Sequence, residues 1–118
     1  MRIIGLVNML RAALVFAALG LGSATAMADQ WTGSLTLAAA HAENDNNVLN
    51  IYVTTSQAVV NPANCSATDA YMTSDPVITN QTLSIALAAL STNATVEIYV
   101  SSTVCTRNRP TILEMQIY

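Results

Sequence analysis

The sequence predicts a small, mainly β domain with one helix, in the element order β-β-β-α-β-β. Three observations support this prediction. Short segments in which apolar and polar residues alternate, as they do in half-buried strands, recur along residues 29–118. One stretch, residues 81–91, instead carries apolar residues at helical spacing. Runs rich in Asn, Pro and Ser separate these segments, as expected for turns.

The first predicted strand covers residues 31–37. Trp31, Leu35 and Leu37 lie on one face of this strand and alternate with hydroxyl residues on the other face. Because large apolar side chains usually face the interior, we expect Trp31 to help close the hydrophobic core. An exposed Trp31 that stacks on a sugar ring or anchors a partner is the alternative.

The alternation stops after this strand. Residues 38–47 are predicted to form a loop, because the run 43–47 contains no apolar residue. His41, the only histidine of the chain, is expected to be solvated in this loop. A second strand is predicted over residues 48–56, where the alternation resumes.

A short third strand is expected within residues 65–73, and the helix follows it. We expect Asn80 to be the N-cap of the helix, and Asn93 to stop it in a left-handed conformation just after Ser91. The residues predicted to face the core have the spacing i, i+3, i+4 and i+7, and they are Leu83, Ala86, Leu87 and Leu90.

Two more strands are predicted at residues 95–101 and 112–118, joined by a loop at 103–110. The inward face of the last strand is expected to carry Leu113, Met115 and Ile117. A helix between the third and fourth of five strands is the element order of the OB-fold, a partly open barrel. The sequence therefore predicts an OB-like small barrel as a single domain over residues 29–118. An α+β sandwich with the same element order is the alternative.

Residues 1–28 are predicted to be a cleaved secretory signal peptide. Their only charges are Arg2 and Arg11, an apolar run follows, and residues 26–28 (Ala-Met-Ala) match the pattern of a cleavage site after Ala28. Arg11 interrupts the stretch of roughly 20 apolar residues that a membrane-spanning helix needs. We therefore expect a secreted or periplasmic protein with no membrane span after cleavage.

Two cysteines, Cys65 and Cys105, lie in the predicted mature chain. An even pair in an exported protein is expected to form a disulfide, which here closes a loop of about 40 residues and contributes roughly 4 kcal/mol. Free thiols and a metal site are the alternatives. Two distant cysteines and a single histidine lack the ligand spacing of a zinc site, so we expect no metal and no cofactor.

Residues 29–118 are acidic, because they hold all seven carboxylates and only Arg107 and Arg109 as cations. Nucleic acid and anionic lipid both require a basic face, so the charge argues against both as partners. Arg107 and Arg109 are suited to gripping a carboxylate or an acidic sugar through paired hydrogen bonds. Pairing with nearby acidic residues is the alternative role.

No catalytic residues are predicted. A nucleophilic triad would need His41 beside a serine and a carboxylate, and the sequence has no Gly-x-Ser-x-Gly elbow. A glycosidase needs two facing carboxylates. The acidic residues considered for such a pair are scattered along the chain, at Asp69, Asp75, Glu97 and Glu114. We therefore expect that the protein is not an enzyme.

The triplet Trp31-Thr32-Gly33 follows the predicted cleavage site, and two strands, a cysteine, a helix and two more strands come after it. This arrangement resembles the B subunit of subtilase cytotoxin and its relatives, which are OB-fold subunits that form ring pentamers and bind sialylated glycans. The chain is shorter at its C-terminus than those subunits and lacks their extra cysteines. No serine within residues 37–41 matches their glycan-contacting serine, so no sugar site is carried over.

A second resemblance involves residues 61–66 (Asn-Pro-Ala-Asn-Cys-Ser), Tyr71 after them, and Cys105 ahead of Arg109-Pro110. These residues are similar to a family of small two-cysteine proteins exported by bacteria. The resemblances imply an exported, non-enzymatic binding module for a glycan or for an envelope or secreted protein.

The helix has no charged residue, so its outer face suits packing against a copy of itself as well as simple exposure to solvent, and a homo-oligomer is one expected assembly. The alternative function is a monomeric periplasmic or envelope accessory protein or inhibitor. The candidate ligand-binding residues are Trp31, Arg107 and Arg109.

Overall fold

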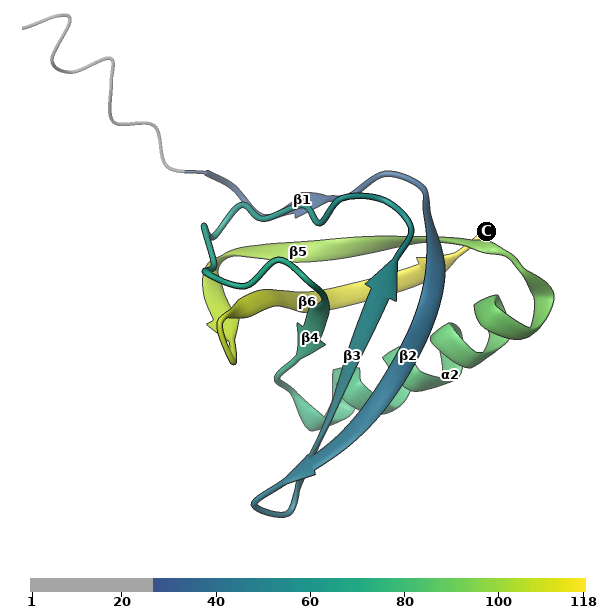
Figure 1. Ribbon diagram of the computed structural model, residues 1–118, viewed down its shortest axis with the longest axis horizontal. Coiled ribbons are helices and arrows are strands. Elements are labelled where there is room, and N and C mark those ends of the chain that lie inside the picture. The colour runs from purple at the N-terminus through teal and green to yellow at the C-terminus, as the bar shows by residue number, and fades with distance from the viewer. Residues whose placement is uncertain (1–26) are drawn as a thin grey trace, which may run out of the picture.

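The computed structural model describes residues 27–118, which form six strands and one helix (Figure 1). The strands are β1 (Gln30–Trp31), β2 (Leu35–Asp45), β3 (Val48–Thr55), β4 (Tyr71–Thr73), β5 (Thr95–Thr106) and β6 (Arg109–Ile117). The helix α2 (Pro76–Thr92) lies between β4 and β5. The predicted mainly β class with one helix is therefore confirmed. The predicted signal peptide, apart from its last two residues, lies outside the described residues.

The strand pairings form a ring. β2 pairs with β3, and β3 with β4, in antiparallel fashion, whereas β4 pairs with β6 in parallel. β6 pairs with β5, and β5 pairs at its start with β2, so the ladder returns to its first strand. The short β1 pairs with the same edge of β5 as β2 does, at the neighbouring residues Tyr99 and Val100. In Figure 1, β5 and β6 run crosswise to the β2–β3 hairpin.

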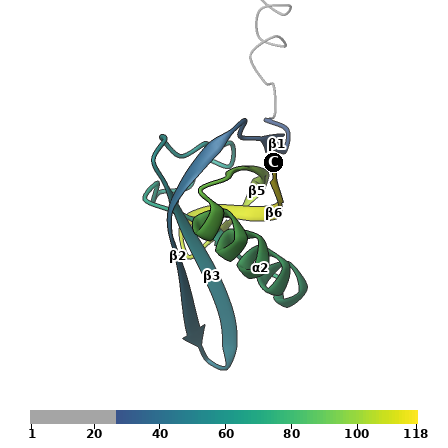
Figure 2. The same ribbon diagram turned by 90° about the vertical axis from the view of Figure 1, so that its right-hand side faces the viewer.

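The core combines side chains from five strands with the inner face of α2, which packs against β2, β3, β4 and β6 (Figure 2). Each large apolar side chain that is fully buried contributes roughly 1.5–3 kcal/mol to folding. The core residues are Leu35, Leu37, Ile51, Val53, Tyr71, Ala86, Ala89, Val96, Ile98, Val100, Ile112 and Met115.

The single strand predicted at residues 31–37 is instead two strands. Gly33 between them has a φ of 78°, a left-handed conformation that glycine adopts without a side-chain clash. From Trp31 to Leu35 the chain advances four residues while β5 advances only three, from Tyr99 to Val96, so one extra residue reverses the face that points inward. Trp31 therefore does not follow Leu35 and Leu37 into the core and is 38% exposed. The prediction of a core position for Trp31 is wrong.

The loop predicted at residues 38–47 is also wrong. β2 continues to Asp45, which pairs with Val48, so only Asn46 and Asn47 form the turn. Their φ values are 51° and 64°, as a tight two-residue hairpin turn requires at both positions. Asparagine adopts this conformation more readily than most residues, so the turn forms at the two asparagines. The strand continues through the first three residues of the polar run 43–47 and ends only at Asp45.

The loop predicted at residues 103–110 is a second hairpin with the same kind of turn. β5 extends to Thr106, which pairs with Arg109 at the start of β6. Arg107 and Asn108 form the turn, with φ values of 48° and 67°. Arginine is uncommon in this conformation, which is why the turn left no clear signal in the sequence.

α2 begins earlier than predicted. Asp75, rather than Asn80, is the N-cap, and its Oδ1 accepts a hydrogen bond of 2.8 Å from the backbone N–H of Val77. Pro76 then occupies the first turn, where no backbone N–H is needed. At the other end, Asn93 is a left-handed C-cap with a φ of 55°, as predicted.

The predicted buried face of α2 is confirmed at Ala86, and Leu83 packs against the core, but Leu87 and Leu90 are 56% and 36% exposed. The other buried residues of α2 are small, at Thr79, Thr82 and Ala89. The hydroxyl of Thr79 donates to Oγ1 of Thr73 (2.7 Å), which in turn accepts from the backbone N–H of Ile51 (2.9 Å). This chain of hydrogen bonds allows a polar residue to bury where the spacing of leucines indicated an apolar contact.

β6 contains a bulge that the sequence did not predict. Two successive pairs with β5 skip Leu113, which is therefore an extra residue on β6. The bulge shifts the alternation, so that Ile112 and Met115 both face the core at 2% and 5% exposure. The inner face predicted for this strand is therefore right at Met115 but wrong at Leu113, which is the extra residue of the bulge, and at Ile117, which is 40% exposed.

The predicted disulfide between Cys65 and Cys105 is confirmed, with Cα atoms 5.7 Å apart. It holds the long connection between β3 and β4 against β5. Of the strand expected within residues 65–73, only Tyr71–Thr73 forms, as β4. A disulfide is typical of an oxidising compartment. Within residues 27–118, the structure has no helix with the length and apolar character needed to cross a membrane.

Candidate functional site

The three candidate residues belong to two separate surfaces. Trp31 lies directly opposite Tyr99 of β5, whereas Arg107 and Arg109 lie at the β5–β6 turn. Arg107 follows Tyr99 by eight residues, a separation of about 26 Å along an extended strand. We name the first surface the aromatic platform (Trp31, Glu97, Tyr99, Glu114, Gln116 and Tyr118). We name the second the ion-pair cluster (Glu43, Asp45, Asp69, Arg107 and Arg109).

In the ion-pair cluster, Arg107 joins the two hairpins. Its guanidinium contacts the carboxylates of Glu43 and Asp45, which both lie on β2. Hydrogen bonding to Glu43, and then to Asp45, raises the pKa of Arg107 above its usual value. The arginine therefore connects the turn between β5 and β6 to the end of β2.

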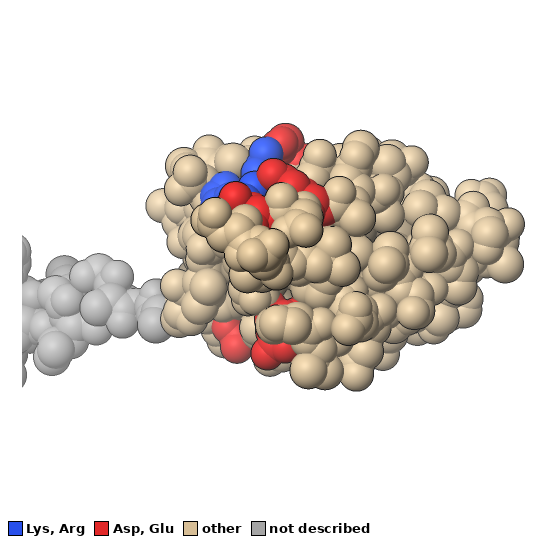
Figure 3. Space-filling view, turned by 90° about the horizontal axis from the view of Figure 1, so that it is seen from below, with Lys and Arg blue, Asp and Glu red and all other residues tan. Residues whose placement is uncertain are grey.

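Arg109 makes a two-pronged contact with Asp69. Its Nε lies 2.8 Å from Oδ1, and its Nη2 lies 3.1 Å from Oδ2, the geometry in which a guanidinium holds a carboxylate most firmly. This hydrogen bonding lowers the pKa of Asp69. The guanidinium carbon also lies 5.8 Å from the ring centre of Tyr52. In Figure 3 the arginines are surrounded by acidic residues at one end of the molecule.

His41 lies beside this cluster rather than in a loop, which corrects the sequence expectation. Its imidazole stacks on the ring of Tyr52, its partner on β3, with ring centres 4.6 Å apart and planes within 10°. The cluster brings three carboxylates to two guanidiniums, and both arginines are already paired. An anionic ligand would have to displace these carboxylates, so the arrangement favours a structural role for Arg107 and Arg109.

The aromatic platform is anchored by Trp31. Its ring centre lies 5.2 Å from that of Tyr99, and the two ring planes are tilted by 34°. The backbone around Trp31 is held on both sides. The next residue, Thr32, exchanges hydrogen bonds with Ile98 through its N–H and its hydroxyl oxygen. The carboxylate of Asp29 accepts from the backbone N–H and the hydroxyl of Ser102, which lowers the pKa of Asp29.

Polar groups lie beside the rings of the platform. Glu97 and Gln116 are opposite each other on β5 and β6, and Nε2 of Gln116 donates to Oε2 of Glu97 at 3.0 Å. The same Nε2 lies 3.2 Å from the hydroxyl oxygen of Tyr118. Hydrogen bonding with Glu97 raises the pKa of Tyr118. Glu114 is exposed and lies opposite Tyr99 on β6. The carboxylate of Glu97, the amide of Gln116 and the hydroxyl of Tyr118 are therefore oriented before any ligand arrives.

The platform unites residues that the sequence separates. Glu97 and Glu114, which are scattered in the sequence, lie on one outer face of two neighbouring strands. The alternation of each strand shows that both point outward, but only the register between β5 and β6 places them together. Residues 27–118 contain no group of three or more His, Cys, Asp or Glu side chains arranged to hold a metal ion.

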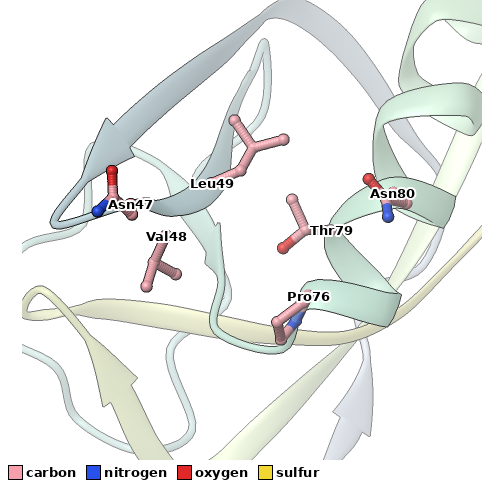
Figure 4. Close-up of a pocket in the computed structure, with 6 residues that line it drawn as sticks. All are labelled: Asn47, Val48, Leu49, Pro76, Thr79 and Asn80. Atoms are coloured by element: carbon pink, nitrogen blue, oxygen red, sulfur yellow. The ribbon is translucent and has the colours of Figure 1, made fainter.

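A groove of about 260 Å³ lies between the β2–β3 turn and the start of α2 (Figure 4). Its lining has no charged side chain, and its residues are Asn47, Val48, Leu49, Pro76, Thr79 and Asn80. The side chains of Val48 and Leu49 are 44% and 40% exposed. The groove holds none of the three residues expected to bind a ligand.

Neither a protein-family model nor a characterised protein matches this chain significantly. The resemblance to the subtilase cytotoxin B subunits therefore stays a prediction from the residues.

Proposed function

We propose that this chain is an exported, non-enzymatic binding module that recognises a glycan through the aromatic platform. The observation that carries the proposal is the exposed position of Trp31 against Tyr99. An indole in a small domain would usually bury in the core, and here it lies on the surface beside oriented hydrogen-bond acceptors. A flat ring next to fixed polar groups suits the apolar face and the hydroxyls of a sugar.

The fold supports the same proposal. Leaving β1 aside, the order β2-β3-β4-α2-β5-β6 is that of an OB-like barrel, and the closed ring of pairings favours a barrel over an α+β sandwich. OB-folds include oligosaccharide-binding members. The acidic charge of residues 29–118 argues against their other common ligand, an oligonucleotide.

The charge of the platform indicates which glycans fit it. Glu97 and Glu114 are its charged groups, and the two arginines of residues 27–118 are paired elsewhere. A sialic acid carboxylate would meet two like charges, which disfavours binding at moderate salt. We therefore expect neutral glycans to bind more tightly than sialylated ones, unlike the subunits that the sequence resembles.

The test is binding of the exported, disulfide-bonded protein to an array of neutral and sialylated glycans, followed by calorimetry. Trp31→Ala should weaken binding of the best neutral glycan at least tenfold, which equals about 1.4 kcal/mol. Leu87→Ala is the matched control, because Leu87 is also an exposed large apolar residue but lies on α2. Equal binding by the wild type and Trp31→Ala would overturn the role of the platform.

The uncharged face of α2 favours a second function, a monomeric accessory protein or inhibitor in the periplasm or envelope. Val77 and Leu87 are 63% and 56% exposed on a helix without any charged side chain, which suits a protein partner. This function would replace the first if no glycan bound while one envelope protein were captured by the wild type but not by Leu87→Glu.

Export itself is part of the proposal and is supported by the Cys65–Cys105 disulfide. We propose that the protein is secreted or periplasmic and that cleavage follows Ala28. Mass spectrometry of the exported protein should show a mature chain that begins at Asp29 and carries the disulfide. Retention of residues 1–28 would contradict cleavage without affecting the binding proposal.

A further inference from the structure

After Thr36, one edge of β2 has no neighbouring strand within residues 27–118. β2 pairs with β5 only at Leu35 and Thr36, whereas it pairs with β3 as far as Asp45. The part of β2 after Thr36 therefore belongs to a two-stranded arm, which extends away from the ring in Figures 1 and 2. Backbone groups along such an edge are free to pair with another strand.

The hydrogen bonds of Ile51 identify which residues of β2 face this edge. Both its N–H and its C=O bond to Oγ1 of Thr73, on the β4 side of β3. Ile51 therefore makes no ladder bonds to Ala42, which lies opposite it on β2. By the alternation of an antiparallel ladder, the N–H and C=O of Ala42 point to the free edge, as do those of Ala40 and Asn44.

From Ala39 onward this edge lacks two features by which proteins usually prevent strand pairing, although a bulge interrupts the ladder with β3 between Leu37 and Ala39. Residues 38–45 contain no lysine and no proline, and four of the eight are alanine. The side chains of Ala42 and Asn44 are exposed, and the small side chain of alanine leaves the edge accessible. Charged residues are present on the outer face of the arm, and their positions decide which strand fits.

The charge pattern along the edge is self-complementary. If two copies pair antiparallel about Ala42, His41 of each copy lies opposite Glu43 of the other. An imidazole N–H can donate to a carboxylate, so both cross-strand pairs are favourable. Only Oε1 of Glu43 bonds to Arg107, which leaves its other oxygen as an acceptor. A shift by one residue in either copy would lose this match.

We propose that two copies of this chain pair edge to edge through β2, on a two-fold axis at Ala42, to form a continuous four-stranded antiparallel sheet. The interface is isologous, as two-fold dimers require. It involves one strand from each copy, so we expect a dimer that dissociates on dilution, in roughly the micromolar range. The aromatic platform lies on β1, β5 and β6, so both copies keep it free and the dimer is bivalent for its ligand.

Ala42→Pro tests the pairing directly. Proline removes the N–H of Ala42, which faces the free edge and makes no bond within one copy, so the monomer should keep its fold. Ala42→Val is the matched control, because it keeps the N–H and suits a strand. In sedimentation equilibrium, the wild type and Ala42→Val should be dimeric, and Ala42→Pro should raise the dissociation constant at least tenfold. Circular dichroism and the intact disulfide check the fold of each variant.

A charge exchange provides a second test that does not depend on proline. H41E places two carboxylates opposite each other at both ends of the pairing and should weaken the dimer at least tenfold. The double variant H41E/E43H restores opposite partners in the same register and should recover much of the lost affinity. Another dimer interface would show no such recovery.

The proposal is overturned by a wild type that stays monomeric at millimolar concentration. It is equally overturned by a dimer or larger ring that Ala42→Pro and H41E leave unchanged, since the interface would then lie elsewhere. Neither result bears on glycan binding, which is measured through Trp31.

Discussion

The ion-pair cluster and the aromatic platform lie at opposite ends of β5 and differ in how their polar groups are used. In the cluster, both arginines are paired with carboxylates, and the nearby disulfide fixes the same end of the molecule. In the platform, an exposed ring lies beside the carboxylates of Glu97 and Glu114, while Arg107 and Arg109 are paired with other acidic residues. The comparison teaches that neighbouring arginines in a sequence can have a structural role in ion pairs, whereas the exposed ring and its nearby acceptors support the ligand site that we propose.

The largest effect on stability should come from the end of the molecule that holds the disulfide, when this bond is reduced. The Cys65–Cys105 bond has a sequence separation of 40 residues, and its loss should destabilise the fold by about 4 kcal/mol. Urea unfolding with and without reductant measures this change. A Cys65→Ala/Cys105→Ala variant is the control, because reductant should not alter its midpoint. A wild type with the same midpoint in both conditions would contradict the expected contribution.

A smaller effect is expected from Tyr71→Phe. The buried hydroxyl of Tyr71 accepts a hydrogen bond of 2.7 Å from the backbone N–H of Val60, so its removal should cost about 1–2 kcal/mol. Burial also raises the pKa of Tyr71 above its ordinary value of 10.0. The folded state thus favours the neutral phenol, and its contribution is complete below pH 10 and declines as the pH rises further. Urea unfolding at pH 7 and above pH 10 should show this loss in the wild type and less of it in Tyr71→Phe.

The smallest effect on stability is expected from Arg109→Gln, because surface ion pairs contribute less than about 1 kcal/mol. The lowered pKa of Asp69 means that this stabilisation is present above the ordinary aspartate pKa of 3.8 and is lost as the pH falls through the lowered value. The difference in unfolding free energy between wild type and variant should therefore be seen at pH 7 and disappear at strongly acidic pH. Glycan binding should be unchanged, and a loss of binding would return the ligand site to the ion-pair cluster.

The sequence predicted the class of the fold, the helix, its left-handed stop at Asn93 and the disulfide. It succeeded there because alternation, helical spacing and paired cysteines are local or compositional signals. It misplaced the ends of β2 and β5 because turns of two residues, at Asn46-Asn47 and Arg107-Asn108, are short enough to hide in longer polar runs.

The candidate site was predicted less completely. The sequence singled out Trp31 but placed it in the core, since the extra residue between Trp31 and Leu35, which reverses the inward face, is not visible in an alternating pattern. The alternation of each strand indicates that Glu97, Tyr99 and Gln116 point outward, but it does not indicate that they lie together. These residues come together on one surface because of the register of β5 against β6. That register includes a bulge at Leu113, which the local sequence pattern does not predict.

β6 is the strand that pairs with both β4 and β5, and it follows every strand it joins. A chain that emerges N-terminus first, from a ribosome or through a membrane pore, therefore cannot close its ring until β6 has emerged. Cys105 likewise emerges only just before this strand, so the covalent link and the last ladder are completed almost together. Until then the ring of strands stays open.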